Sequence, residues 1–124
     1  MIVLLDTHAL IWALENNPML SAAARAAIVD PDNIVLASAV SAWEIAIKKA
    51  LGRLSVPDDL ERVAGAAGFT PRPVTFADAR RLEGLPPHHR DPFDRMLVAQ
   101  AMQDGVPIVT RDPQLASYNI QTIW

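Results

Sequence analysis

The sequence contains no cysteine. This absence excludes a disulfide framework and a thiolate metal site, and it suits a reducing compartment. No apolar stretch is long enough to span a bilayer. The opening run MIVLL is too short for a secretory signal and has no basic residue before it, so we interpret it as a strand. We therefore expect a soluble, cytoplasmic protein.

The sequence also lacks an excess of positive charge. Its 11 Lys and Arg residues are outnumbered by 14 Asp and Glu, for a formal net charge of −3. This balance argues against a nonspecific nucleic-acid binder with a broad basic face, although a local basic rim around an acidic site remains open. The 124 residues, 51% of them hydrophobic, show no repeat or linker and fit one domain over residues 1–124.

Short apolar runs alternate with helical patterns along the chain. The runs at 2–5, 34–38 and 107–110 are continuous and rich in branched residues, as expected of strands buried on both faces of a parallel sheet. Segments 71–74 and 120–124 are weaker strand candidates, and prolines favour an edge position for the first. Helices are predicted at 8–15, 20–29, 42–51, 58–67, 76–85 and 92–103. This alternation predicts a single-domain α/β/α sandwich with a mainly parallel central sheet.

Acidic residues stand at the ends of the predicted strands. Asp6 follows the first strand, Glu44 opens the helix after the second, Asp94 opens the helix before the third, and Asp112 follows the third. The carboxyl ends of parallel strands meet at one edge of a sheet, so these acids can converge there. Converging carboxylates repel one another unless a cation neutralises them, and oxygen ligands select Mg²⁺ or Mn²⁺. Such a site suits phosphodiester hydrolysis.

Each acid also has a simpler interpretation as a helix cap. Asp6 and Asp112 could cap the helices that follow them, Asp112 with Pro113 at the first helical position. Glu44 could complete a capping box with Ser41 or pair with Lys48 one turn later.

The segment HHRDPFDR at 88–95 raises the same question. Asp91 would be the N-cap, Pro92 would take the first helical position, and Asp94 would lie in the first turn, where the helix dipole favours negative charge. Both interpretations remain open for this pair.

Four strings, in this order, resemble the PIN-domain ribonucleases of the VapC toxin type: LLDTHALIW, SAWEIAIKKALGRL, LPPHHRDPFDRMLVAQA and VTRDPQLASY. The resemblance extends from Met1 to Trp124. It implies an α/β/α fold with a parallel sheet, endoribonuclease activity that depends on Mg²⁺ or Mn²⁺, a homodimer, and an antitoxin that blocks the site.

The resemblance also implies roles for individual residues. Asp6 and Asp94 resemble the central metal ligands, with Glu44 as the third catalytic acid and Asp112 as the fourth. Asp91 is an addition that makes a further candidate ligand. The hydroxyl residues that would support the site are Thr7 and Thr110.

Other polar and aromatic residues have less specific interpretations. We expect surface or packing roles for His8, His88 and His89, and core or dimer packing for Trp12 and Trp43. Apolar helical faces around Ile11, Trp12 and Leu14, and around Ile45 and Ile47, exceed the needs of one core and favour a homodimer. The basic residues that could hold RNA phosphates, if they are not simply solvated, are Lys48, Arg90, Arg95 and Arg111.

Three competing functions can be weighed. A phosphoacceptor receiver-like signalling domain requires a lysine after a late strand to contact the phosphoryl group. The only lysines here are Lys48 and Lys49, which counts against this function. A phosphatase of the DxDxT type has its second aspartate at the position of His8, so the histidine counts against this function. A catalytically inactive binding module would not need all four acids.

Overall fold

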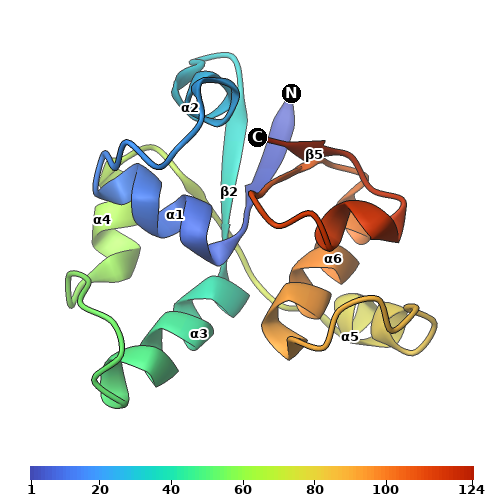
Figure 1. The fold of residues 1–124 in the computed structure, drawn as a ribbon. Helices are drawn as coiled ribbons and strands as arrows, with labels where there is room; N and C mark the ends of the chain where they lie inside the picture. The colour runs from blue at the N-terminus through green and yellow to red at the C-terminus, as the bar shows by residue number, and fades with distance from the viewer.

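A computed structural model describes all 124 residues, which form one five-stranded sheet between helices (Figure 1). All neighbouring strands are parallel, and the spatial order is β3-β2-β1-β4-β5. The strands are β1 (Ile2–Leu5), β2 (Ile34–Ser38), β3 (Thr70–Arg72), β4 (Ile108–Val109) and β5 (Thr122–Ile123). The predicted α/β class is therefore confirmed. No helix is long and apolar enough to cross a membrane.

The helices cover both faces of this sheet. They are α1 (Thr7–Leu14), α2 (Ala22–Val29), α3 (Ala39–Ala50), α4 (Leu60–Ala66), α5 (Phe76–Leu82), α6 (Pro92–Asp104) and a 3₁₀ helix, η1 (Leu115–Tyr118). In Figure 1, α1, α2 and α4 lie on one side of the strands and α5 and α6 on the other. Alternate residues of β1 face the two layers: Val3 and Leu5 pack toward α1, α2 and α4, whereas Leu4 packs toward α6.

The central strands are the ones that the sequence predicts best. β1 and β2 have the predicted bounds, and Val3, Leu4 and Leu5 are fully buried. β3 lies at an edge of the sheet, as its prolines predicted. β4 is shorter than expected, with two residues instead of four, and β5 also has only two.

The start of α3 differs from the prediction. The helix begins at Ala39, three residues earlier than expected, because the hydroxyl of Ser38 at the end of β2 accepts a hydrogen bond from Val40 N (3.0 Å). Ser41 is therefore inside the helix and cannot be its cap. The proposed capping box between Ser41 and Glu44 is wrong, and Glu44 lies in the second turn instead of opening the helix.

The apolar residues expected to be in excess of one core are partly core residues. Ile11 and Ile45 are buried, and Trp12 and Leu14 pack against the same core. Trp43, in contrast, is 60% exposed and makes an edge contact with the ring of Phe93. The large exposed hydrophobic residues here are Trp43 and Ile47 of α3 and Leu51 at its C-cap, which are spaced four residues apart and share one face.

Candidate active site

Asp6 connects the end of β1 to the start of α1 and is buried. Its Oδ1 accepts a hydrogen bond from Ala9 N (2.8 Å), which caps α1, and its Oδ2 accepts one from Thr110 Oγ1 (2.5 Å). Burial raises the pKa of the Asp6 carboxyl despite these two hydrogen bonds, and the charge of Asp112 adds to the increase. The predicted cap is therefore present, and the same carboxyl group also lies among other acids.

Asp91 and Asp94 have different environments at the start of α6. Asp91 is the N-cap, since its Oδ1 accepts hydrogen bonds from Phe93 N (2.8 Å) and Asp94 N (3.2 Å), and Pro92 occupies the first helical position as predicted. Burial raises the pKa of Asp94 to about 7, and the charges of Asp91, Asp6 and Glu44 contribute. The structure therefore brings three predicted site acids, Asp6, Glu44 and Asp94, into one electrostatic cluster.

Glu44 is buried and held on both carboxylate oxygens. Oε1 lies 2.6 Å from Thr7 Oγ1, which is also 3.0 Å from Ser41 Oγ, and Oε2 accepts from Lys48 Nζ at 2.6 Å. Because Thr7 directly follows Asp6, its hydroxyl ties the start of α1 to α3. Both predicted hydroxyl residues are thus in place, Thr7 on Glu44 and Thr110 on Asp6.

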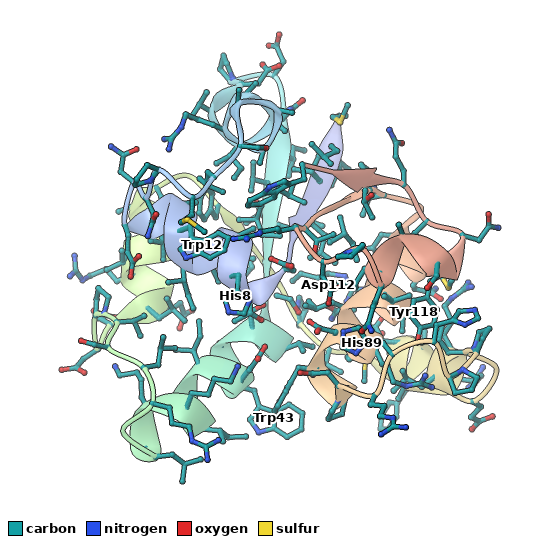
Figure 2. All side chains as sticks on the ribbon, in the orientation of Figure 1. His8, Trp12, Trp43, His89, Asp112 and Tyr118 are labelled. Atoms are coloured by element: carbon teal, nitrogen blue, oxygen red, sulfur yellow. The ribbon has the colours of Figure 1, made fainter.

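Asp112 lies after β4 and contacts a histidine from a distant loop. Its Oδ2 is 2.9 Å from His89 Nε2, and its Oδ1 accepts from Gln114 N at 2.9 Å. The chain forms a turn here, and the 3₁₀ helix begins only at Leu115, so the expectation of Pro113 at the first helical position is wrong. Figure 2 shows His89 close to Asp112, with Tyr118 to the right of the histidine.

His89 is the site residue that sequence reasoning missed. Its Nε2 also lies 3.2 Å from Asp94 Oδ2, so one imidazole contacts two of the predicted site acids, and the three groups lie within 4.8 Å of one another. Its position two residues before the predicted cap Asp91 was the available signal. His8 and His88 are exposed, as expected, and each packs against one aromatic ring, that of Trp12 and that of Tyr118.

Of the four basic residues predicted to contact RNA, two are bound to groups within the chain and two are exposed. Arg95 donates to the carbonyl oxygens of Leu85 and Pro86, so it stabilises the loop before α6. Lys48 is paired with Glu44. Arg90 and Arg111 are exposed near the acids, and the Arg111 guanidinium lies 5.9 Å from the Trp12 ring centroid.

The donor set fits a divalent cation. Four carboxylates gather at the carboxyl edge of the sheet, and the pKa values of Asp6 and Asp94 are both raised, so a positive charge bound among them would relieve their repulsion. The chain itself supplies only partial compensation, through Lys48 at Glu44 and the imidazole of His89. Oxygen donors of this kind suit Mg²⁺ or Mn²⁺.

Known proteins resemble this chain in sequence and in fold. The PIN-domain family profile matches residues 3–120. Ribonuclease VapC22 of Mycobacterium tuberculosis (strain ATCC 25618 / H37Rv) is 33% identical over 133 aligned positions, which cover 98% of each chain.

Two solved structures share the fold at low sequence identity. A chain of VapBC2 from Rickettsia felis, bound to a DNA fragment from its promoter, superposes with a TM-score of 0.69 at 11% identity and covers 98% of this chain and 97% of its own. A chain of VapBC-1 from nontypeable Haemophilus influenzae gives a TM-score of 0.62 at 18% identity, with coverages of 98% and 96%.

Proposed function

The chain belongs to the PIN-domain family, and we propose that it is a metal-dependent endoribonuclease that acts as the toxin of a toxin–antitoxin pair. A relative named as a ribonuclease, 33% identical over nearly the full length of both chains, supports the choice of RNA as substrate. The fold shared with chains of VapBC2 and VapBC-1 supports an antitoxin partner.

The observation that carries this proposal is the cluster at the carboxyl edge of the sheet, where side-chain atoms of Asp94, Asp112 and His89 lie within 4.8 Å of one another. In this cluster, burial and the neighbouring charges of Asp91, Asp6 and Glu44 raise the pKa of Asp94 to about 7. A folded protein keeps such an unfavourable cluster most readily when a ligand offsets it. Asp6 and Asp94 would be the central ligands, with Asp112 and Glu44 beside them. When bound, the cation would supply Lewis-acid chemistry, activating water and offsetting the charge that develops on the phosphate.

The chain's own residues would orient the reacting groups. Thr110 and the Ala9 N–H fix both oxygens of Asp6, so that carboxylate is preorganised. Thr7 and Lys48 do the same for Glu44. Asp91 uses one oxygen to accept two backbone N–H groups, so we assign it to aiming α6 and not to the centre of the metal site. Exposed Arg90 and Arg111 would hold RNA phosphates.

The alternative of a receiver-like signalling domain gains no support. Lys48 lies on α3, after the second strand, and it is paired with Glu44 instead of following a late strand.

Sequencing of RNA 5′ ends after brief induction tests the proposed function. We expect new, discrete 5′ ends that depend on the wild-type chain and disappear with Asp6→Asn produced at the same level. An RNA pattern that is the same in both strains would contradict an endoribonuclease role.

A further inference from the structure

The loop before α6 places one histidine ring between two acids. His89 Nε2 lies 2.9 Å from Asp112 Oδ2 and 3.2 Å from Asp94 Oδ2, and the His89 side chain is 13% exposed. The residue comes from the loop before α6, whereas Asp112 follows β4, so the ring joins two segments that are distant in the sequence. This nitrogen could either bind a cation through its lone pair or donate a hydrogen bond to the two carboxylates.

The hydrogen bond made by the other ring nitrogen, Nδ1, distinguishes these two roles. Asp91 N lies 3.0 Å from His89 Nδ1 and donates its hydrogen to it, so Nδ1 must present a lone pair. A neutral imidazole then carries its proton on Nε2, where it points at the two acids. A histidine that binds a metal through Nε2 needs the opposite arrangement, with an N–H at Nδ1 donating to a carboxylate or carbonyl. The peptide N–H of Asp91 opposes that tautomer.

Further contacts hold the loop that carries the ring. The backbone N–H of His89 donates to the hydroxyl of Tyr118 (2.7 Å), which is buried. Arg95 extends to the same hydroxyl, with Nη1 3.3 Å away, and its guanidinium also binds carbonyl oxygens of the loop. These contacts hold the backbone of the loop, and the ring itself is held by the hydrogen bonds of Nδ1 with Asp91 N and of Nε2 with Asp112, which a turned-over imidazole would lose.

We propose that His89 is a positioning residue and not a metal ligand: its Nε2–H bridges Oδ2 of Asp94 and Oδ2 of Asp112 and so fixes how the two carboxylates are oriented. This inference rests on the proposed function of the site. The proposal explains physically why His89, Asp91 and Asp94 lie so close together in the segment HHRDPFD. Asp91 aims α6 through its carboxylate and sets the histidine tautomer through its N–H, and that tautomer in turn orients Asp94.

The tautomer can be measured directly in the protein without metal. In long-range ¹⁵N–¹H NMR spectra of the wild-type chain we expect His89 to show a protonated Nε2 and an unprotonated Nδ1. The pattern should remain the same when Mg²⁺ is added. A proton on Nδ1, either before or after Mg²⁺ addition, would overturn the proposal. His88→Ala serves to assign the neighbouring ring, because His88 contacts Tyr118 and none of the site acids.

Calorimetry with Mn²⁺ tests the positioning role separately from RNA cleavage. We expect His89→Ala to weaken Mn²⁺ binding by about tenfold, as is usual when a group that orients a ligand is lost. His89→Gln, whose amide N–H can replace Nε2–H, should restore most of the affinity, and His88→Ala should match wild type. No loss in His89→Ala, or equal losses in the alanine and glutamine variants, would contradict the proposal. If wild type itself bound no Mn²⁺, the proposed metal site would fail, while the NMR pattern would still test the tautomer.

Discussion

Folding changes the proton affinity of the Asp94 carboxyl. Its pKa rises from an ordinary 3.8 to about 7, first through burial and then through the charges of Asp91, Asp6 and Glu44, while His89 opposes the rise. The folded state therefore holds a proton that the unfolded state releases between these two pH values. Stability must fall as pH increases across this interval when no cation is present.

The first prediction concerns Asp94→Asn. In the presence of EDTA, the substitution should stabilise the protein above about pH 7, by on the order of 1 kcal/mol, because a buried negative charge is removed. Well below the ordinary pKa the difference should vanish, since Asp94 is then neutral in both states. Thermal unfolding over this pH range measures the effect. An identical change at both ends of the range would rule out the electrostatic explanation.

A second prediction separates the two acids of DPFD. Asp94→Asn should weaken Mn²⁺ binding and RNA cleavage by at least tenfold if Asp94 is a central ligand. Asp91→Asn should retain most of both, because an asparagine oxygen can accept the same two N–H groups at the N-cap. Calorimetry and a cleavage assay on the matched pair provide the comparison. Equal, small effects would favour a purely capping role, and a larger loss at Asp91 would mean that the two roles are exchanged.

At the scale of elements, the ends of β1 and β4 are joined at the candidate site. Asp6 N donates to the Val109 carbonyl (3.1 Å), and Thr110 Oγ1 both donates to Asp6 and accepts from Asp112 N (3.0 Å). One hydroxyl therefore connects two of the four acids. Figure 2 places Asp112 close to where β1 ends and α1 begins.

Thr110→Val should test this connection. The substitution keeps the shape but leaves Asp6 with one fewer donor, so we expect a loss of about 1 to 3 kcal/mol in the free energy of unfolding. We also expect Mn²⁺ binding to weaken by about tenfold. Thr110→Ser, which retains the hydroxyl, should stay near wild type in both measurements. If valine and serine had the same effect, the hydroxyl would have no part in orienting Asp6.

The sequence predicts elements well where one local signal dominates. The continuous branched runs of β1 and β2 have no competing interpretation, and DP marks the start of α6 at Pro92. The start of α3 was missed because Ser38 is both the last strand residue and the helix cap, so no turn signal separates the two elements.

The candidate site was predictable in its acids but not in its histidine. Chain order places Asp6, Glu44, Asp94 and Asp112 near the carboxyl ends of strands, and a parallel sheet brings those ends together. The direction of a loop imidazole depends instead on tertiary contacts, such as the one between His89 N and the Tyr118 hydroxyl. Capping and a role in the site are also not exclusive alternatives, because Asp6 caps α1 and lies in the acid cluster.

At the scale of the whole molecule, one apolar face remains largely exposed. Trp43 and Ile47 of α3 share this face with Leu51 at the C-cap of the helix, and Trp43 is 60% exposed. Together with the resemblance to VapC-type toxins, this face favours a homodimer. We expect light scattering at micromolar concentration to give the mass of two chains, and Trp43→Glu to give a folded monomer. A monomeric mass for the wild-type chain would contradict the dimer.

The central claim is that the carboxylate cluster hydrolyses RNA only with a divalent cation. The most direct measurement is cleavage of RNA by the purified chain after treatment with excess EDTA and after return of Mg²⁺ or Mn²⁺, with Asp6→Asn as the matched control. We expect no cleavage in EDTA, recovery with either cation, and a folded but inactive Asp6→Asn chain. Cleavage that persists in excess EDTA, or in the Asp6→Asn variant, would contradict the account.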